Sequence, residues 1–425
     1  MFAKTKSKFI ILLSLIFCLS FALCALTACG GNGNNDKPGE SDKPEKELSV
    51  TLTPTQAELL VGETVKLEVK TEYVEKAGIT TKSEMTVRNM NMVRNPLFTS
   101  SDKSVATVSS SGLVTAIAKG TAVITATVEG KSATADITIL NGIEIDSANK
   151  IVDIYNADGL TSFNGSVNDD EVSYNDYKIN LKRDIDLNGA SWYPLNGYNL
   201  AGTVWNGNGH AVKNLKISSV INTVNITGPE ISATGFIAAS YKITMKNIVF
   251  DNVTVAPNNF EYYAGIVLGY LDGAGEFDNV TVKNSNITTV SRRGTGAIVG
   301  FNNDQYFIGE QLIKSTLVIK NSLVENVTIE SNRSAALCGR VCNGYSVNEK
   351  AMDVHSVILV NNTVKNCTVK AVVDYTPGRL NFTVNDDIDT VITDFDATNV
   401  SVGNRYFFNN VEYNYSNGVF TVKSK

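Results

Sequence analysis

Four segments between residues 245 and 369 repeat one pattern of apolar and polar positions. In each segment the apolar residues stand five positions apart, and an Asn follows two positions after the first and the second of them. These asparagines are Asn247 and Asn252, Asn279 and Asn284, Asn321 and Asn326, and Asn361 and Asn366. Such a repeat indicates a stacked architecture in which each unit buries its apolar face against its neighbours.

The five-residue spacing predicts short strands separated by bends, because it matches neither the period of a helix nor that of a long strand. The apolar residues then point inward and the asparagines lie at the bends. Strands of successive units stack about 4.8 Å apart, so equivalent Asn side chains fall in line. Each amide is then able to donate to one neighbour and accept from another, which predicts a structural Asn ladder.

A second motif, a short apolar run closed by glycine, recurs between the segments. It reads Gly-Ile-Val-Leu-Gly at residues 265–269, Gly-Ala-Ile-Val-Gly at 296–300 and Ala-Leu-Cys-Gly at 336–339. We interpret these runs as buried strands whose final glycine permits a tight turn. The run at 296–300, continued by Phe301 and two asparagines, resembles the GLUG-type repeats of bacterial surface proteins. That resemblance implies a right-handed parallel β-helix for residues 142–425.

Residues 48–141 follow a different pattern. Residues 48–52 and 65–69 alternate between apolar and polar side chains, as half-buried strands do. The stretch Ser-Asp-Lys-Ser-Val-Ala-Thr-Val, followed by Gly-Leu-Val-Thr-Ala, resembles the group-2 bacterial immunoglobulin-like (Ig-like) domain. Phe98 stands where that family usually has Trp, and segment 72–96 is longer than the usual connection. The resemblance implies a small β-sandwich that acts mostly as a stalk or spacer, so the whole chain is expected to be all-β.

Residues 1–28 have the features of a signal peptide, with a basic start and an apolar run over residues 9–26. The run ends in Leu-Thr-Ala-Cys29, which resembles a bacterial lipobox. This resemblance implies cleavage before Cys29, acylation of Cys29, and a lipid anchor that holds the protein outside the cytoplasm at the cell surface. The alternative is an uncut membrane anchor. Residues 29–47 are predicted to be a flexible linker.

The two glycines after Cys29 favour a Gram-positive envelope, although the sequence leaves a Gram-negative one open. The formal net charge of −6 argues against a nucleic-acid partner. The chain holds two His residues, which argues against histidine-based metal or acid–base chemistry. No cofactor signature is present, and none is expected.

Alignment of the repeats places aromatic and cationic residues just before the glycine runs. These candidate ligand-binding residues are Tyr262, Tyr263, Arg292, Arg293 and Arg333. We expect them to form one surface stripe that suits sugars, because aromatic rings stack on pyranose faces and Arg forks grip acidic groups. The alternative is a solvated turn region. Trp192 and Trp205 are also able to serve as carbohydrate platforms, but packing in the first coils is favoured for them.

Two further groups of residues have side chains that suit metal binding or thiol chemistry. Asp386, Asp387 and Asp389 form a weak candidate for Ca²⁺ binding, and a solvated turn is the alternative. Cys338 and Cys367 fall in apolar columns of the repeat and are predicted to be small buried side chains. No catalytic residue is assigned.

The sequence therefore predicts a lipid-anchored surface protein whose β-helix binds glycan or a neighbouring surface protein on an Ig-like stalk. One alternative is a polysaccharide lyase or hydrolase, which needs a carboxylate pair or a Ca²⁺ cluster with a base. The acids of the regular repeats are few and singly placed, so an enzyme is the less favoured reading. The other alternative is a purely structural envelope protein. The ligand and the oligomeric state stay open.

Overall fold

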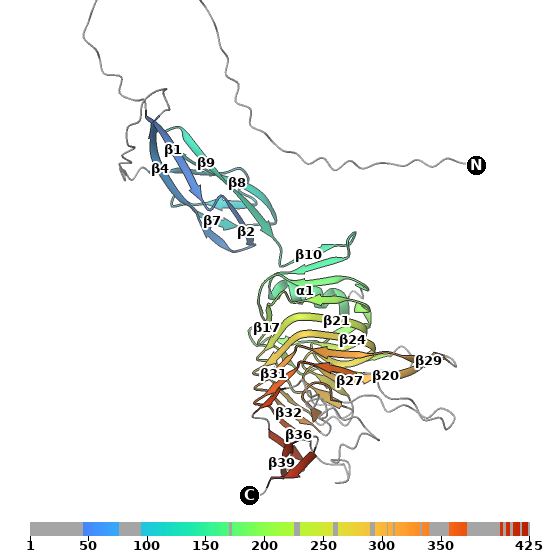
Figure 1. The fold of residues 1–425 in the computed structure, drawn as a ribbon. Helices are drawn as coiled ribbons and strands as arrows, with labels where there is room; N and C mark the ends of the chain where they lie inside the picture. The colour runs from blue at the N-terminus through green and yellow to red at the C-terminus, as the bar shows by residue number, and fades with distance from the viewer. Residues whose placement is uncertain are drawn as a thin grey trace, which may run out of the picture. The chain divides into compact units, whose positions relative to one another are not determined.

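The computed structural model describes residues 46–75, 95–169, 172–224, 230–257, 262–289, 294–303, 305–308, 311–331, 334–339, 357–371, 400–402, 405–408, 411–416 and 419–423. The chain divides into two compact units, Met1–Glu47 with Tyr73–Thr86 and Leu48–Glu72 with Val87–Lys425. Apart from the ends of β1 and β4, every element below lies in the second unit. Strands dominate, and the described residues hold one α-helix, so the all-β class is confirmed (Figure 1).

The first nine strands make up the Ig-like region. They are β1 (Lys46–Thr53), β2 (Gln56–Leu60), β3 (Thr64–Lys66), β4 (Glu68–Glu75), β5 (Leu97–Ser100), β6 (Ala106–Val108), β7 (Leu113–Ala116), β8 (Gly120–Val128) and β9 (Lys131–Leu140). They form sheets of order β2-β9-β8-β5, β3-β7-β6 and β1-β4. Alternate side chains of β8 and β9 are buried, including Ile124 and Ile137, and they share one apolar cluster with Val114 of β7. The period-two pattern of the sequence thus gives each sheet one inward face.

The repeat region begins with an antiparallel pair and then continues through parallel strands. Its first strands are β10 (Ile143–Asp146), β11 (Ile151–Ile154), β12 (Lys178–Leu181), β13 (Ile185–Asp186), β14 (Ser191–Trp192), β15 (Leu195–Gly197), β16 (Val204–Asn206), β17 (Ala211–Lys213), β18 (Lys216–Ile217), β19 (Ile221–Val224) and β20 (Glu230–Thr234), with the 3-10 helix η1 (Tyr198–Leu200) after β15. β10 pairs antiparallel with β11, and β11 pairs parallel with β12.

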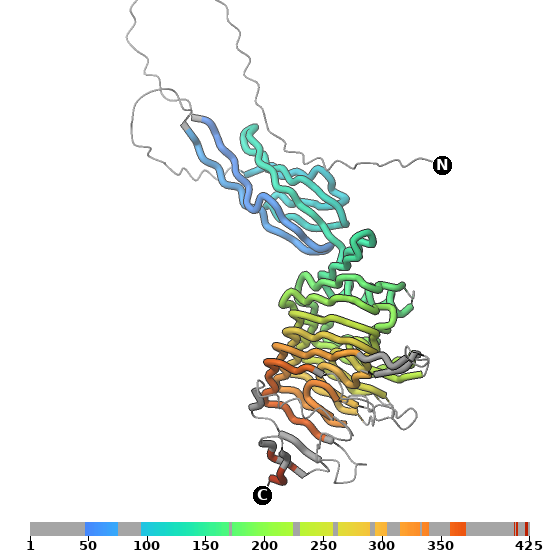
Figure 2. Tube along the Cα trace, turned by 45° about the vertical axis from the view of Figure 1, so that its right-hand side comes forward, coloured from blue at the N-terminus to red at the C-terminus, as the bar shows by residue number. Residues whose placement is uncertain are grey.

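Later strands visit three sheets in turn. They are β21 (Ile237–Asp251), β22 (Thr254–Val255), β23 (Tyr263–Gly265), β24 (Leu268–Lys283), β25 (Asn286–Thr288), β26 (Gly294–Gly296), β27 (Val299–Asn303), β30 (Leu317–Lys320), β31 (Leu323–Glu325), β32 (Thr328–Ser331), β33 (Ser334–Ala335), β34 (Val357–Val360), β35 (Thr363–Lys365) and β36 (Thr368–Ala371). β21, β22 and β23 belong to the fifteen-, nine- and five-stranded sheets, and β24, β25 and β26 follow the same order. We call one such passage a coil; Figure 2 shows the coils stacked on one another.

Equivalent residues of the four repeats are register partners. Met245 pairs with Phe277, which pairs with Ile319, which in turn pairs with Leu359. The second apolar position runs from Phe250 through Val282 and Val324 to Val364, and the third from Val255 through Ile287 and Ile329 to Val369. The four segments therefore stack in register, as their shared spacing predicts.

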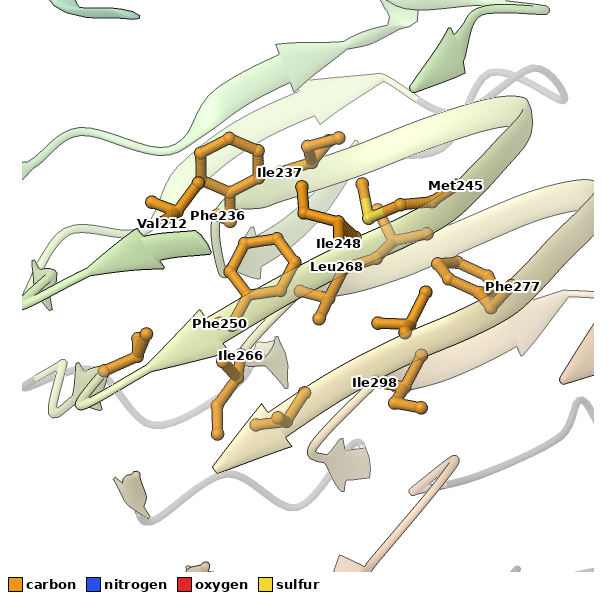
Figure 3. Close-up of a cluster of buried hydrophobic side chains, with 14 of the residues drawn as sticks. Val212, Phe236, Ile237, Met245, Ile248, Phe250, Ile266, Leu268, Phe277 and Ile298 are labelled. Carbon is orange, nitrogen blue, oxygen red and sulfur yellow. The ribbon is translucent and has the colours of Figure 1, made fainter. Parts of the chain in front are cut away.

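The main apolar cluster fills the interior of the stack. Met245, Phe250 and Phe277 are fully buried in it, and the Phe250 ring lies beside Phe236 with centroids 5.2 Å apart (Figure 3). Trp192 and Trp205 belong to the same cluster, and the Trp192 ring stacks on Phe236 with centroids 5.2 Å apart. Packing of both tryptophans, which the sequence favoured over a carbohydrate platform, is therefore confirmed.

The asparagines of the repeat occupy left-handed bends. Asn247 and Asn252 have φ values of 52° and 57°, and the other six lie between 52° and 56°. Among non-glycine residues, Asn is one of the few that adopts this conformation at low cost, because its short polar side chain bonds locally. The bend itself therefore selects Asn, in addition to any bond between side chains.

Side-chain amides of neighbouring coils bond to one another. Asn279 Nδ2 donates to Asn247 Oδ1 over 2.9 Å, and Asn326 donates to Asn284 over 3.1 Å. Two rungs differ from the predicted ladder, because Asn284 donates to Asp251 and Asn321 donates to Asp278. Asp251 and Asp278 each directly precede a repeat Asn in the chain, so an acid takes the acceptor role at those rungs.

The closing glycines have a different cause from the one predicted. Gly269, Gly300 and Gly339 do not have positive φ, so a left-handed turn does not explain them. A Cβ on Gly300 would lie 2.4 Å from the Ala264 carbonyl oxygen and 2.5 Å from that of Gly269. Backbone atoms also crowd the Cβ positions of Gly269 and Gly339. These positions are glycine because the backbones of adjacent strands approach closely.

Both ends of the stack carry elements outside the repeat. Helix α1 (Ala157–Asn168), which sequence analysis did not predict, starts at Asn156, whose Oδ1 accepts a hydrogen bond from the Gly159 amide. Leu160, Phe163 and Val167 of α1 are buried in the main cluster. The far end holds β37 (Val400–Val402), β38 (Arg405–Phe408), β39 (Val411–Ser416) and β40 (Val419–Val422), of which β38–β39 and β39–β40 pair antiparallel.

Candidate functional site

The structure separates the two tyrosines of the predicted ligand stripe. Tyr262 is fully buried, and its hydroxyl donates to the Pro257 carbonyl oxygen over 3.3 Å. Its place on an exposed stripe was therefore wrong, because the ring points into the fold and not toward solvent. Tyr263, the next residue, is half-buried and faces the opposite side of β23. Arg292, Arg293 and Arg333 lie outside the described residues.

Tyr263 belongs to an apolar cluster that is separate from the main core. Its ring centroid lies 4.9 Å from that of Tyr270 and 4.5 Å from that of Phe301. The Tyr270 and Phe301 rings stack at 5.2 Å with their planes 17° apart. Tyr198 packs against the same group. We call Tyr198, Tyr263, Tyr270 and Phe301 the outer aromatic cluster.

The outward direction of this cluster follows from the alternation of side chains in β24 and β27. Leu271 lies in the main core, so Tyr270 and Asp272, its neighbours in the strand, face the other side of the sheet. Tyr270 pairs in register with Phe301, and Asp272 pairs with Asn303. Stacking of coils thus brings four side chains from two strands onto one outer face.

A hairpin of β19 and β20 extends the cluster. The two strands pair antiparallel, and Ile221 and Ile231 pack with Tyr270 and Phe301. A second antiparallel hairpin, β28 (Gln305–Ile308) with β29 (Gln311–Lys314), follows directly after β27. Figure 1 shows β20 and β29 on the same side of the stack. The β19–β20 hairpin therefore packs on the outer aromatic cluster, and the β28–β29 hairpin leaves the stack on the same side.

A buried carboxylate lies beside the aromatic rings. Asp272 is fully buried, and its Oδ1 accepts a hydrogen bond of 2.9 Å from Asn303 Nδ2. The Tyr198 hydroxyl lies 3.4 Å from Asp272 Oδ2 and donates to it. Burial, together with the negative charge of Asp272, holds the pKa of Tyr198 well above its usual value. Tyr198 therefore keeps its proton and stays a neutral hydroxyl.

One polar side chain next to this site is unsatisfied. Asn302 is fully buried and is the register partner of Leu271, which packs in the main core. Among the described residues, neither Oδ1 nor Nδ2 of Asn302 has a hydrogen-bond partner. A buried polar group without a partner lowers the free energy of unfolding by about 1–3 kcal/mol. Asn302 therefore destabilises the fold beneath the outer face.

On another face of the stack, acidic and basic side chains alternate from coil to coil. Six register partners form one column, in the order Asp186, Lys213, Asp251, Lys283, Glu325 and Lys365. A second column holds Lys246, Asp278 and Lys320 with the opposite phase, so these three coils each contribute one charge of each sign. A surface of alternating charges has no net field to concentrate a polyanion or a polycation.

At its first coils this face also holds one of the two histidines. Asp184 accepts a hydrogen bond of 2.6 Å from Lys213 Nζ, and His210 Nδ1 lies 3.4 Å away from the same carboxylate. The hydrogen bond from Lys213 lowers the pKa of Asp184 most, and the Ala211 amide contributes. Ion pairing of half-exposed groups accounts for this arrangement.

The other residues singled out from the sequence are either buried in the core or outside the described residues. Cys338 and Cys367 are buried in the main core, as the apolar columns predicted. Cys29 and the Ca²⁺ candidates Asp386, Asp387 and Asp389 lie outside the described residues. Within the described ranges, no three His, Cys, Asp or Glu side chains gather closely enough to hold a metal ion. Nor do those ranges contain a helix long and apolar enough to cross a bilayer.

Sequence reasoning missed the residues that complete the outer aromatic cluster. Tyr270 and Phe301 directly follow Gly269 and Gly300, so aligning the repeats one residue further would have placed them in one column. Tyr198 carried no such signal, because it reaches Asp272 from η1, far away in the sequence.

Comparison with known proteins identifies one part of the chain. The family described as bacterial Ig-like domain (group 2) matches residues 48–139. The predicted Ig-like domain is therefore confirmed, and it suggests a surface or adhesion-type protein. No curated protein matches the chain.

Proposed function

We propose that this protein is a lipid-anchored cell-surface binding protein that uses the outer aromatic cluster to hold a glycan. The observation that carries the proposal is the half-buried Tyr263 ring, which is fixed on a floor of stacked Tyr270 and Phe301 outside the main core. A rigid aromatic face binds a flat apolar surface, such as that of a pyranose ring, at little cost in conformational entropy.

The repeat region is proposed to be a right-handed parallel β-helix. Three sheets visited in a fixed order, parallel pairing and in-register repeats support this architecture. It gives a binding protein an extended rigid surface, since each coil adds one strand to each sheet. The Ig-like domain would then be the stalk between this surface and the anchor.

Anchoring through Cys29 is proposed from the Leu-Thr-Ala-Cys29 motif. The test is incorporation of labelled fatty acid and recovery in the membrane fraction for the full chain and for Cys29→Ala. Cys24→Ala, which changes a cysteine of the same leader, is the matched control. We expect loss of label in Cys29→Ala alone, and equal labelling of both variants would contradict the anchor.

Glycan binding is tested with the purified full chain on a panel of immobilised polysaccharides. Tyr263→Ala is expected to lower retention by about tenfold or more, while Tyr193→Ala, at an exposed tyrosine of the same region, leaves it unchanged. Reducing and unsaturated ends are recorded in the same samples. Their release would favour the polysaccharide lyase or hydrolase, and the absence of both retention and cleavage would favour a structural envelope protein.

A further inference from the structure

Two side-chain hydrogen bonds beside the outer aromatic cluster run toward one acceptor, the Asp272 carboxylate. Both contacts of Asp272 described above are made by donors, the Tyr198 hydroxyl and the Asn303 amide. Both carboxylate oxygens of Asp272 therefore act as acceptors, and such hydrogen bonds favour its charged form. Tyr198 has therefore committed its single proton to Asp272, and the lone pairs of its oxygen are what it offers to a ligand.

Asn303 is oriented in the same way. Its Nδ2 donates to Asp272, which fixes the amide so that Oδ1 is its remaining acceptor. Tyr198 is half-buried and Asn303 is only 8% exposed, so the small part of these two side chains that reaches the surface beside the aromatic rings offers acceptors. Asp272 is fully buried, so it acts through them and not by touching a ligand.

We infer that Asp272 is a positioning residue that restricts the outer aromatic cluster to ligands that donate hydrogen bonds, namely neutral, hydroxyl-rich glycans, and excludes polyanionic ones. Carboxylate and sulfate groups only accept hydrogen bonds. Placed opposite Tyr198 and Asn303, their oxygens would face protein oxygens with no proton between them, which is unfavourable in a partly desolvated site. A site built for one hydrogen-bonding direction rejects the wrong partner strongly. This inference rests on the proposed glycan binding.

The test compares two polymers that differ at one group, polygalacturonate and its carboxyl-reduced form, in which each carboxylate is a primary alcohol. The purified full chain is passed over both. We expect the reduced polymer to be retained at least about tenfold more strongly. Equal retention, or preference for polygalacturonate, would overturn the inference while leaving glycan binding intact. If the protein retained neither form nor any neutral polymer of the panel, both the proposed function and this inference would fail.

Asp272→Asn tests the positioning role. An amide at this position is able to donate to the Tyr198 oxygen, which frees the Tyr198 proton to point outward. We expect binding of the neutral polymer to change little and the preference for it to fall severalfold. If Asp272→Asn lowered the retention of both polymers equally, Asp272 would have a merely structural role and the assignment would be overturned. Asp153→Asn, at an acid that accepts from Asn180 on the same domain, is the control and should keep the preference.

Tyr198→Phe keeps the test decisive if Asp272→Asn does not fold. Removal of the hydroxyl abolishes the outward acceptor while the ring still packs against the cluster. We expect weaker retention of the neutral polymer and, because the opposing acceptor is gone, equal or stronger retention of polygalacturonate. Unchanged retention of the neutral polymer would contradict the role given to Tyr198.

Discussion

Lys283 and Asp251 are register partners on adjacent coils, and the Lys283 Nζ lies 3.4 Å from the Asp251 Oδ2. The same Asp251 accepts a hydrogen bond from Asn284, so one carboxylate joins the charge column to the Asn ladder. On its other side Lys283 is the partner of Glu325. Because the apolar pattern of every coil is nearly the same, a slip by one coil would keep the core but place like charges together. The alternating charges therefore help to fix the register.

Reversing one charge of the column should destabilise the stack. Lys283→Glu would place an acid between Asp251 and Glu325, and we expect a loss of about 1 kcal/mol at low salt, since half-exposed ion pairs are weak. The loss should shrink in about 1 M salt, where screening acts over roughly 3 Å. Urea unfolding at the two salt concentrations measures it. The control is Lys216→Glu, whose register partners Ser191 and Thr254 are uncharged; an equal, salt-independent loss in both variants would contradict the idea.

Two substitutions of Asn284 separate its side-chain bonds from its backbone conformation. Asn284 accepts from Asn326, donates to Asp251 and has a φ of 52°. Asn284→Gly removes the bonds and relieves the conformation, whereas Asn284→Ala removes the bonds and adds a left-handed strain of about 1–2 kcal/mol. We expect the alanine variant to lose about 2–4 kcal/mol in total and the glycine variant clearly less. Unchanged thermal stability of both would argue that the ladder contributes nothing.

Gly300→Ala should damage the fold through contact with neighbouring backbone. The added Cβ would meet two carbonyl oxygens that cannot move independently of their strands, and we expect a loss of about 3 kcal/mol or more, or failure to fold. Soluble yield and circular dichroism report it. Gly209→Ala is the control, because Gly209 has a φ of 85° and open space around the Cβ position. A smaller loss for Gly300→Ala than for Gly209→Ala would show that backbone conformation, and not close approach, selects glycine.

Asn302→Leu should stabilise the protein. The substitution removes two buried polar atoms that have no partner among the described residues, and it places a second leucine beside Leu271 in the core. We expect a gain of about 1–3 kcal/mol, measured by chemical unfolding. Asn303→Leu is the matched change one residue away and should destabilise, because Asn303 donates to the buried Asp272. A loss of stability in Asn302→Leu would mean that the polar group at position 302 is used.

The sequence by itself determined the repeating units of this protein. Apolar residues at a five-residue spacing, with Asn at each bend, specify both the inward face and the bends, because inward packing and left-handed φ are local demands on residue type. The alternation in residues 48–141 similarly specified the Ig-like strands, and the family match agrees. The repeats up to residue 369 could be recognised because each one carries this local pattern.

Only the tertiary structure decided which side chains meet. Tyr262 and Tyr263 are adjacent in sequence, yet one is buried and the other joins the outer aromatic cluster, since that outcome depends on the phase of one short strand. Tyr198 and Asp272 are 74 residues apart and meet because coils stack. Helix α1 was missed although Leu160, Phe163 and Val167 are spaced as on one face of a helix; its two glycines and its Ser, Thr and Asn residues are poor helix formers, and burial against the end of the stack stabilises it. Contacts across coils depend on register, and register is a property of the assembled stack.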